Sequence, residues 1–125
     1  AFALLTDSIR VGAREIDLAL EFEFTMRRMG SDGLAFPIIA VSGERSSLPH
    51  GVPTDAKVQD GDFITFDFGA RYDGYCSDET RTFVVGHLDQ KHEEIYKIVL
   101  EAQLAGLDAV KPGALGKDVD AAAEK

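Results

Sequence analysis

The sequence predicts an α+β fold in which an antiparallel β-hairpin is covered by helices. Two runs rich in Phe, Ile, Val and Thr, residues 62–69 and 75–85, flank the dipeptide Asp73-Gly74. Asp-Gly between such runs is a leading signal of a two-residue hairpin turn. Residues 13–29 and 89–110 instead repeat apolar side chains at helical spacing. Since the chain has 125 residues, we expect one domain at most.

The helix expected over residues 13–29 has a wide apolar face and ends at Gly30, because glycine favours the left-handed conformation that closes helices. That face is formed by Ile16, Leu20, Phe24 and Met29 and is widened by Leu18, Phe22 and Met26. Further along, FPIIAV at residues 36–41 predicts a short buried strand that begins after Pro37.

The helix expected over residues 89–110 has clear boundaries, because Asp89 can cap its start and Lys111-Pro112-Gly113 ends it. Its apolar stripe is Ile95, Ile98, Val99, Ala102 and Ala105. The first residues, AFALLTDSI, have the pattern of the middle of an amphipathic helix, and the last, GKDVDAAAEK, that of the first turns of another. Both patterns indicate that the chain is a fragment.

Composition argues against several classes of protein. The chain has 22 acidic and 13 basic residues, a net charge of −9, and no basic cluster of the kind that binds a phosphate backbone, so we expect no nucleic-acid partner. No apolar run approaches the about 18 residues of a membrane span, and the N-terminus lacks the pattern of a signal peptide. The single cysteine, Cys76, excludes an internal disulfide and suits a reducing compartment. We expect a soluble, cytoplasmic protein.

Two aspartates interrupt the apolar pattern of the hairpin. With the turn placed as above, Asp67 faces Thr80 on the partner strand, and Asp78 faces Gly69, whose missing side chain leaves room. The two acids then lie on one face as diagonal neighbours, roughly 7 Å apart at the backbone. A buried, unpaired carboxylate is costly, so the pair predicts a bound cation; the alternative is that both acids lie on an exposed surface. Aspartate oxygens suit hard divalent ions, and an added histidine shifts the preference toward Mn, Fe, Co or Zn.

A long polar loop, residues 42–61, precedes the hairpin. Loops of this length inside a compact domain are usually functional or disordered. It contains His50, in the string SLPHGVP. A single loop histidine is more often exposed and without a role, and that interpretation stays open on these residues alone.

Taken together, three strings closely resemble the pita-bread metallopeptidases, and among them the Xaa-Pro peptidases (prolidase and aminopeptidase P). The strings are SGERSSLPHGVP, GDFITFDFGARYDGYCSDETRTFVVG and EEIYKIVLEAQLAGLDAVKPG. The resemblance covers essentially the whole chain, and its most specific part is the spacing of His50, Asp67 and Asp78. It implies that residues 1–125 are a partial metallopeptidase catalytic domain, the first half of the pita-bread fold, with the C-terminal half absent.

The resemblance also implies a role for each residue. Asp67 and Asp78 match the first two ligands of a site for two divalent metal ions, manganese by implication, with cobalt and zinc as alternatives. His50 matches a catalytic residue that contacts the substrate and the transition state, and Thr80 would steady the carboxylates. The implied activity is metal-dependent hydrolysis of the peptide bond before proline in dipeptides or short peptides, with His50 and a metal ion stabilising the oxyanion.

The match is incomplete, because the family completes its metal centre with one histidine and two glutamates from beyond the equivalent of Lys125. We therefore expect this chain alone to be inactive. The alternatives are a non-catalytic pita-bread binding module, a methionine aminopeptidase and a creatinase-like enzyme. The three site residues together argue against the first, the string SDETRTF against the second, and the intact Asp pair against the third. Members of the family are often dimers, so a homodimer is a further expectation.

Overall fold

The protein is described from a computed structural model that covers residue 3 and residues 5–124. Between Leu88 and Asp89 the chain divides into two compact units. The first holds helix α1 (Glu15–Arg28) and strands β1 (Gly33–Leu34), β2 (Ile39–Ser42), β3 (Phe63–Phe68), β4 (Ala70–Tyr72), β5 (Tyr75–Cys76) and β6 (Glu79–Val84). The second holds helices α2 (Gln90–Ala109) and α3 (Gly116–Ala123). Short 3-10 helices lie at Thr6–Ser8 and Gly43–Ser47.

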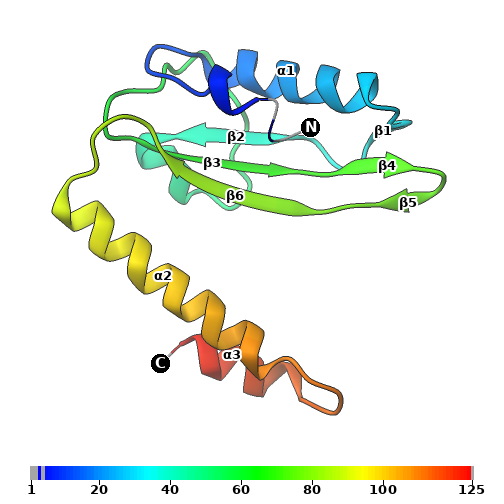
Figure 1. Ribbon diagram of the computed structural model, residues 1–125, viewed down its shortest axis with the longest axis vertical. Coiled ribbons are helices and arrows are strands. Elements are labelled where there is room, and N and C mark those ends of the chain that lie inside the picture. The colour runs from blue at the N-terminus through cyan, green and yellow to red at the C-terminus, as the bar shows by residue number, and fades with distance from the viewer. Residues whose placement is uncertain (1–2, 4, 125) are drawn as a thin grey trace. The chain divides into compact units, whose positions relative to one another are not determined.

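One long hairpin contributes to both sheets of the first unit. β3 leads through Gly69 into β4, the chain turns at Asp73 and Gly74, and β5 leads through residues 77–78 into β6 (Figure 1). Both turn residues have positive φ, 47° and 81°, as a type I′ turn requires. Among the described residues, β2–β3–β6 form one antiparallel sheet and β1–β4–β5 the other. The predicted hairpin is confirmed.

Helix α1 covers one face of the β2–β3–β6 sheet (Figure 1). The strand β3 alternates, with Ile64, Phe66 and Phe68 buried and the residues between them half-buried. The ring of Phe22 in α1 stacks on Phe66 with centroids 4.9 Å apart and lies 5.0 Å from the ring of Phe68. This aromatic cluster is the centre of the core, and it leaves the other face of β3 available for a site.

The prediction of which residues form the centre of the buried face of α1 is wrong. The residues expected only to widen it are the buried ones: Leu18, Phe22 and Met26. The residues expected to form it are exposed: Ile16, Leu20, Phe24 and Met29. The buried stripe begins at the carboxylate of Glu15, which a count of apolar residues leaves out. The predicted end is confirmed, since Gly30 has a φ of 104° and closes the helix.

The second unit confirms the predicted cap of α2 and shows its apolar stripe exposed. The Asp89 carboxylate accepts a hydrogen bond from the backbone N–H of His92 at 2.8 Å, and this bond lowers the pKa of Asp89. In the part of the chain that the structure describes, no residue of α2 is buried, and Ile98 and Val99 of the predicted stripe are 65% and 61% exposed. The helix expected near the C-terminus is confirmed as α3.

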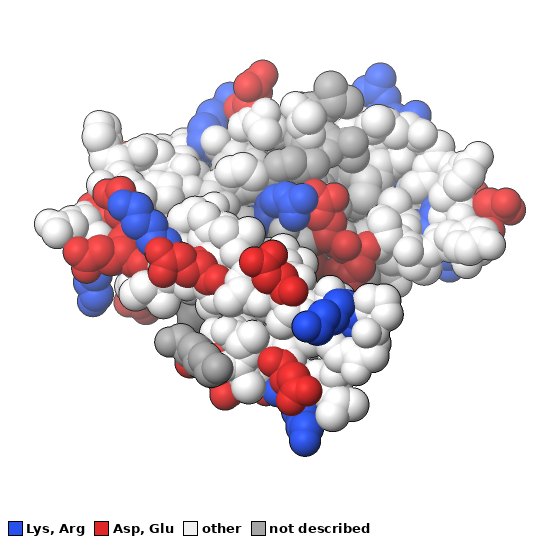
Figure 2. Space-filling view, turned by 60° about the horizontal axis from the view of Figure 1, so that its bottom comes forward, with Lys and Arg blue, Asp and Glu red and all other residues white. Residues whose placement is uncertain are grey.

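At the N-terminus, residues 1, 2 and 4 of the expected amphipathic helix lie outside the described residues. Of the described residues in this stretch, Thr6–Ser8 form a short 3-10 helix and none is α-helical. On the face shown in Figure 2, acidic and basic side chains lie interspersed over the surface. No described helix combines the length and the apolar character that a membrane crossing needs.

Candidate active site

One pocket of the first unit is lined by three of the four predicted site residues, His50, Asp67 and Asp78. Its volume is about 530 Å³. The other lining residues are almost all apolar: Phe36, Pro37, Ile38, Ile39, Gly51, Val52 and Pro53. A concave, mostly apolar surface with a few convergent polar groups is the usual form of a ligand site. The fold therefore brings residues from a loop, a strand and a strand junction to one place.

Asp67 lies on the central strand of its sheet, on the face opposite α1. In register it pairs with Ile39 on one side and with Thr80 on the other, so the predicted pairing of Asp67 with Thr80 is confirmed. The Thr80 hydroxyl donates a hydrogen bond to Oδ1 of Asp67 at 2.9 Å. Asp67 is half-buried and lines the pocket, and this bond orients its carboxylate.

Asp78 lies at the junction of β5 and β6, where the two sheets of the hairpin meet, and its side chain is exposed. The neighbouring Ser77 fixes this junction: its N–H donates to the Ala70 carbonyl at 2.9 Å, and its hydroxyl accepts from the Ala70 N–H at 3.0 Å. The structure shows close packing around Gly69. A Cβ on Gly69 would lie 2.1 Å from the carbonyl oxygen of Ser77 and 2.8 Å from the ring of Phe36, so the glycine permits close packing at this junction.

His50 reaches the pocket from the loop between β2 and β3. The next residue, Gly51, is buried against Val41 of β2, where a Cβ would lie 2.7 Å from Cγ1 of Val41. The loop therefore lies tightly on the strand beside His50, and the histidine itself stays exposed at the edge of the pocket. The sequence indicated a long polar loop, and the structure shows that this loop forms one wall of the pocket.

Glu15 is a charged residue near the site that the sequence analysis missed. Its side chain is fully buried, and it accepts hydrogen bonds from the backbone and the hydroxyl of both Ser42 and Thr54. Burial alone would raise the pKa of Glu15, but these bonds outweigh it and lower the pKa below its usual value. An acid in the first turn of a helix is ordinarily exposed. The only signal in the sequence that Glu15 is buried was therefore the pair Ser42 and Thr54, which lie far along the chain.

The donor atoms of the pocket fit part of a metal site. Asp67 and Asp78 offer the carboxylate oxygens that hard divalent cations prefer. Within the described residues, however, no three His, Cys, Asp or Glu side chains come together in a group that would hold a metal ion. The described residues therefore form no complete metal site, and the two carboxylates match only part of one.

The helices and antiparallel strands form an α+β half-domain of the pita-bread type. The chain belongs to metallopeptidase family M24, whose model matches residues 1–125.

Similar proteins carry related names. The Xaa-Pro dipeptidase of Pyrococcus furiosus is 44% identical over 119 residues, which is 95% of this chain and 34% of that protein. The solved Xaa-Pro dipeptidase from Bacillus anthracis is 49% identical with a TM-score of 0.93, over 98% of this chain and 34% of that one. The X-Pro aminopeptidase from Thermotoga maritima is 43% identical, also with a TM-score of 0.93, over 98% of this chain and 35% of that one. The predicted fold class is confirmed, and the chain spans about a third of the length of these proteins.

Proposed function

We propose that this chain forms part of a metal-dependent peptidase that hydrolyses the peptide bond before proline in dipeptides or short peptides. The observation that carries the proposal is the convergence of His50, Asp67 and Asp78 on one pocket. The names of the similar proteins support the choice of Xaa-Pro substrates. Because the chain spans about a third of their length, the activity is proposed for a protein that contains it.

Asp67 and Asp78 are the proposed ligands of two divalent ions, with manganese as the first candidate and cobalt or zinc as alternatives. When bound, the ions supply Lewis-acid chemistry toward water and the peptide carbonyl. Thr80 keeps the Asp67 carboxylate in place through its 2.9 Å hydrogen bond, as the outer partners of metal ligands commonly do. With two carboxylates alone the ion site is incomplete, so the isolated chain is expected to be inactive.

His50 is the proposed partner of the substrate. From the edge of the pocket it would donate a hydrogen bond to the carbonyl oxygen of the bond before proline, where negative charge develops during hydrolysis. The apolar side chains around it, Phe36, Val52 and Pro53 among them, suit the ring of a proline residue. In this proposal His50 stabilises the developing negative charge, and the apolar walls of the pocket bind the proline ring.

The proposal is testable in a chimera in which this chain replaces the matching residues of the Pyrococcus furiosus Xaa-Pro dipeptidase, called the prolidase chimera below. We expect the chimera to cleave Xaa-Pro dipeptides and to leave Xaa-Ala dipeptides intact. Asp67→Asn should abolish most activity and Mn²⁺ binding, and His50→Ala should lower kcat about 10²-fold with metal content unchanged. Asp108→Asn, a change at an exposed acid of α2, is the matched control.

Four results would contradict the proposal or part of it. Full activity of the Asp67→Asn chimera would remove the metal assignment, and loss of metal in the His50→Ala chimera would make the histidine a ligand. A folded chimera that binds Xaa-Pro peptides without cleaving them would favour the non-catalytic binding module. Preference for peptides with N-terminal methionine would favour the methionine aminopeptidase alternative.

A further inference from the structure

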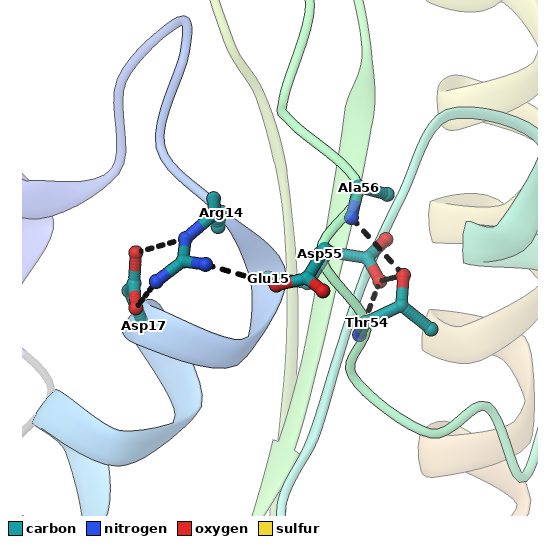
Figure 3. Close-up of polar contacts among 6 residues, drawn as sticks. All are labelled: Arg14, Glu15, Asp17, Thr54, Asp55 and Ala56. Atoms are coloured by element: carbon teal, nitrogen blue, oxygen red, sulfur yellow. Dashed lines mark hydrogen bonds and ion pairs between the residues drawn. The ribbon is translucent and has the colours of Figure 1, made fainter.

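The segment that carries His50, residues 43–53, starts and ends at one buried carboxylate. Ser42, just before the segment, donates to Oε1 of Glu15 from its backbone N–H at 2.7 Å and from its hydroxyl at 3.0 Å. Thr54, just after it, donates to Oε2 from its N–H at 3.0 Å and from its hydroxyl at 2.9 Å (Figure 3). Hydrogen bonds to an ionised acceptor are roughly twice as strong as neutral ones. Glu15 therefore joins the two ends of the segment by hydrogen bonds.

Inside the segment, Arg45 adds a second connection. Its guanidinium donates to the carbonyl oxygen of Val52 at 2.6 Å, which ties the start of the segment to the residue two positions after His50. Its Nε also lies 3.5 Å from Oε2 of Glu15, as an ion pair without hydrogen-bond geometry. Arg45 thus connects the first residues of the loop both to Val52 and to the carboxylate of Glu15.

Glu15 is itself fixed in place by the start of α1. Its backbone N–H donates to the carbonyl oxygen of Ala56 at 3.0 Å. The preceding Arg14 binds Asp17 on its own helix, with both contacts at 2.7 Å, and Asp55 beyond the segment at 2.9 Å (Figure 3). Hydrogen bonds and ion pairs therefore join the helix start to the stretch after the His50 segment, next to the Glu15 carboxylate.

We propose that Glu15 is a positioning residue that acts through His50. The His50 side chain is exposed at the edge of the pocket, so its place depends on the backbone that carries it. Glu15 is not a pocket-lining residue, and it acts by setting the course of residues 43–53. The functional part of this inference rests on the proposed role of His50, whereas the structural part does not.

The structural part is tested on the chain itself by hydrogen–deuterium exchange. Glu15→Gln replaces one acceptor oxygen by an NH₂ group, which no longer accepts from a backbone N–H. We expect exchange in residues 43–53 to rise about tenfold or more relative to β3, whose exchange reports any general loss of stability. Arg45→Gln, at a half-buried position, should raise it in the same segment with less effect on the fold. Glu23→Gln, which removes an exposed ion pair of α1, should change neither.

The functional part is tested by a double-mutant cycle in the prolidase chimera. Glu15→Gln should lower kcat about tenfold or more with metal content unchanged, and in the His50→Ala background it should lower kcat less than about twofold. Equal losses in both backgrounds would overturn the inference, because Glu15 would then act without His50. Unchanged exchange in residues 43–53, or a rise only in step with β3, would also overturn it. If His50→Ala itself has no effect on kcat, the proposed function of His50 fails, while the exchange result still decides whether Glu15 holds the segment.

Discussion

Replacing Gly69 by alanine should force the hairpin open at the point where the two aspartates of the pocket come together. The added Cβ would lie 2.1 Å from the carbonyl oxygen of Ser77, 2.8 Å from Cε1 of Phe36 and 2.9 Å from Cβ of Ala35. The carbonyl belongs to the backbone, and the N–H of the same residue is bonded to Ala70 at 2.9 Å. The Ser77 carbonyl therefore cannot move away from the new Cβ without disturbing the pairing of β4 with β5.

The size of the effect follows from these contacts. A carbon–oxygen contact is normal at about 3.3 Å, so the strands must separate by more than about 1 Å. Overpacking a core position typically costs about 1–3 kcal/mol, and a lost strand hydrogen bond adds about 1 kcal/mol. We expect the free energy of unfolding to fall by about 3 kcal/mol, which is a large part of the about 5–15 kcal/mol that keeps a domain folded.

The assay is a urea titration followed by the NMR signals of β3 and β6. For a slope of about 1–3 kcal/mol per M, the midpoint should fall by about 1–3 M. The matched control is Gly116→Ala in α3, where a Cβ meets nothing within 4 Å and which should be neutral or slightly stabilising. An unchanged midpoint for Gly69→Ala would refute the close packing at this junction.

Three further perturbations test other parts of the structure. Phe22→Ala should cost about 3–5 kcal/mol in urea unfolding because its ring is 1% exposed, whereas Phe24→Ala, at 61% exposure on the same helix, should cost less than about 1 kcal/mol; equal losses would mean that α1 presents another face to the sheet. Asp89→Ala should lower the helix content measured by circular dichroism, and Asp89→Asn should keep it. The folded state lowers the pKa of Asp89. Acidification through that lowered pKa should therefore weaken the helix in the natural chain and leave the Asp89→Asn variant unchanged. Glu15→Gln should lower the free energy of unfolding by about 3 kcal/mol near neutral pH. Because the folded state lowers the pKa of Glu15, this stability is present above the usual pKa and is lost as pH falls through the pKa of the folded state. The stability difference between the natural chain and the variant should therefore close in acid. A gap that stays constant with pH would contradict the charged state of the buried carboxylate.

The hairpin was predictable because its signals are local. Asp73-Gly74 selects the turn, the turn sets the register, and the register places Asp67 opposite Thr80. The break at Gly69 was not predictable in the same way, because Phe36 and Ala35, from a distant part of the chain, pack against this position. Local rules therefore gave the pairing, and tertiary packing decided where the pairing is interrupted.

The orientation of α1 shows the limit of apolar patterns. The helix has apolar residues on more than one side, and the sequence alone favoured Ile16, Leu20 and Phe24 as the buried set. The buried stripe instead includes Glu15, whose burial is compensated by four donors from Ser42 and Thr54. Those partners lie far along the chain, so a buried acid of this kind escapes any rule based on hydrophobic spacing.

Titration of Mn²⁺ into the isotopically labelled chain tests the metal assignment most directly. The ion is paramagnetic and broadens the NMR signals of nearby nuclei, so even the weak site that two carboxylates form is detectable. We predict broadening centred on Asp67 and Asp78 that reaches His50 and Thr80, that disappears in Asp67→Asn and that persists in Asp108→Asn. Broadening centred on other acidic residues, or unchanged by Asp67→Asn, would contradict the assignment of this pocket as the metal site of a peptidase.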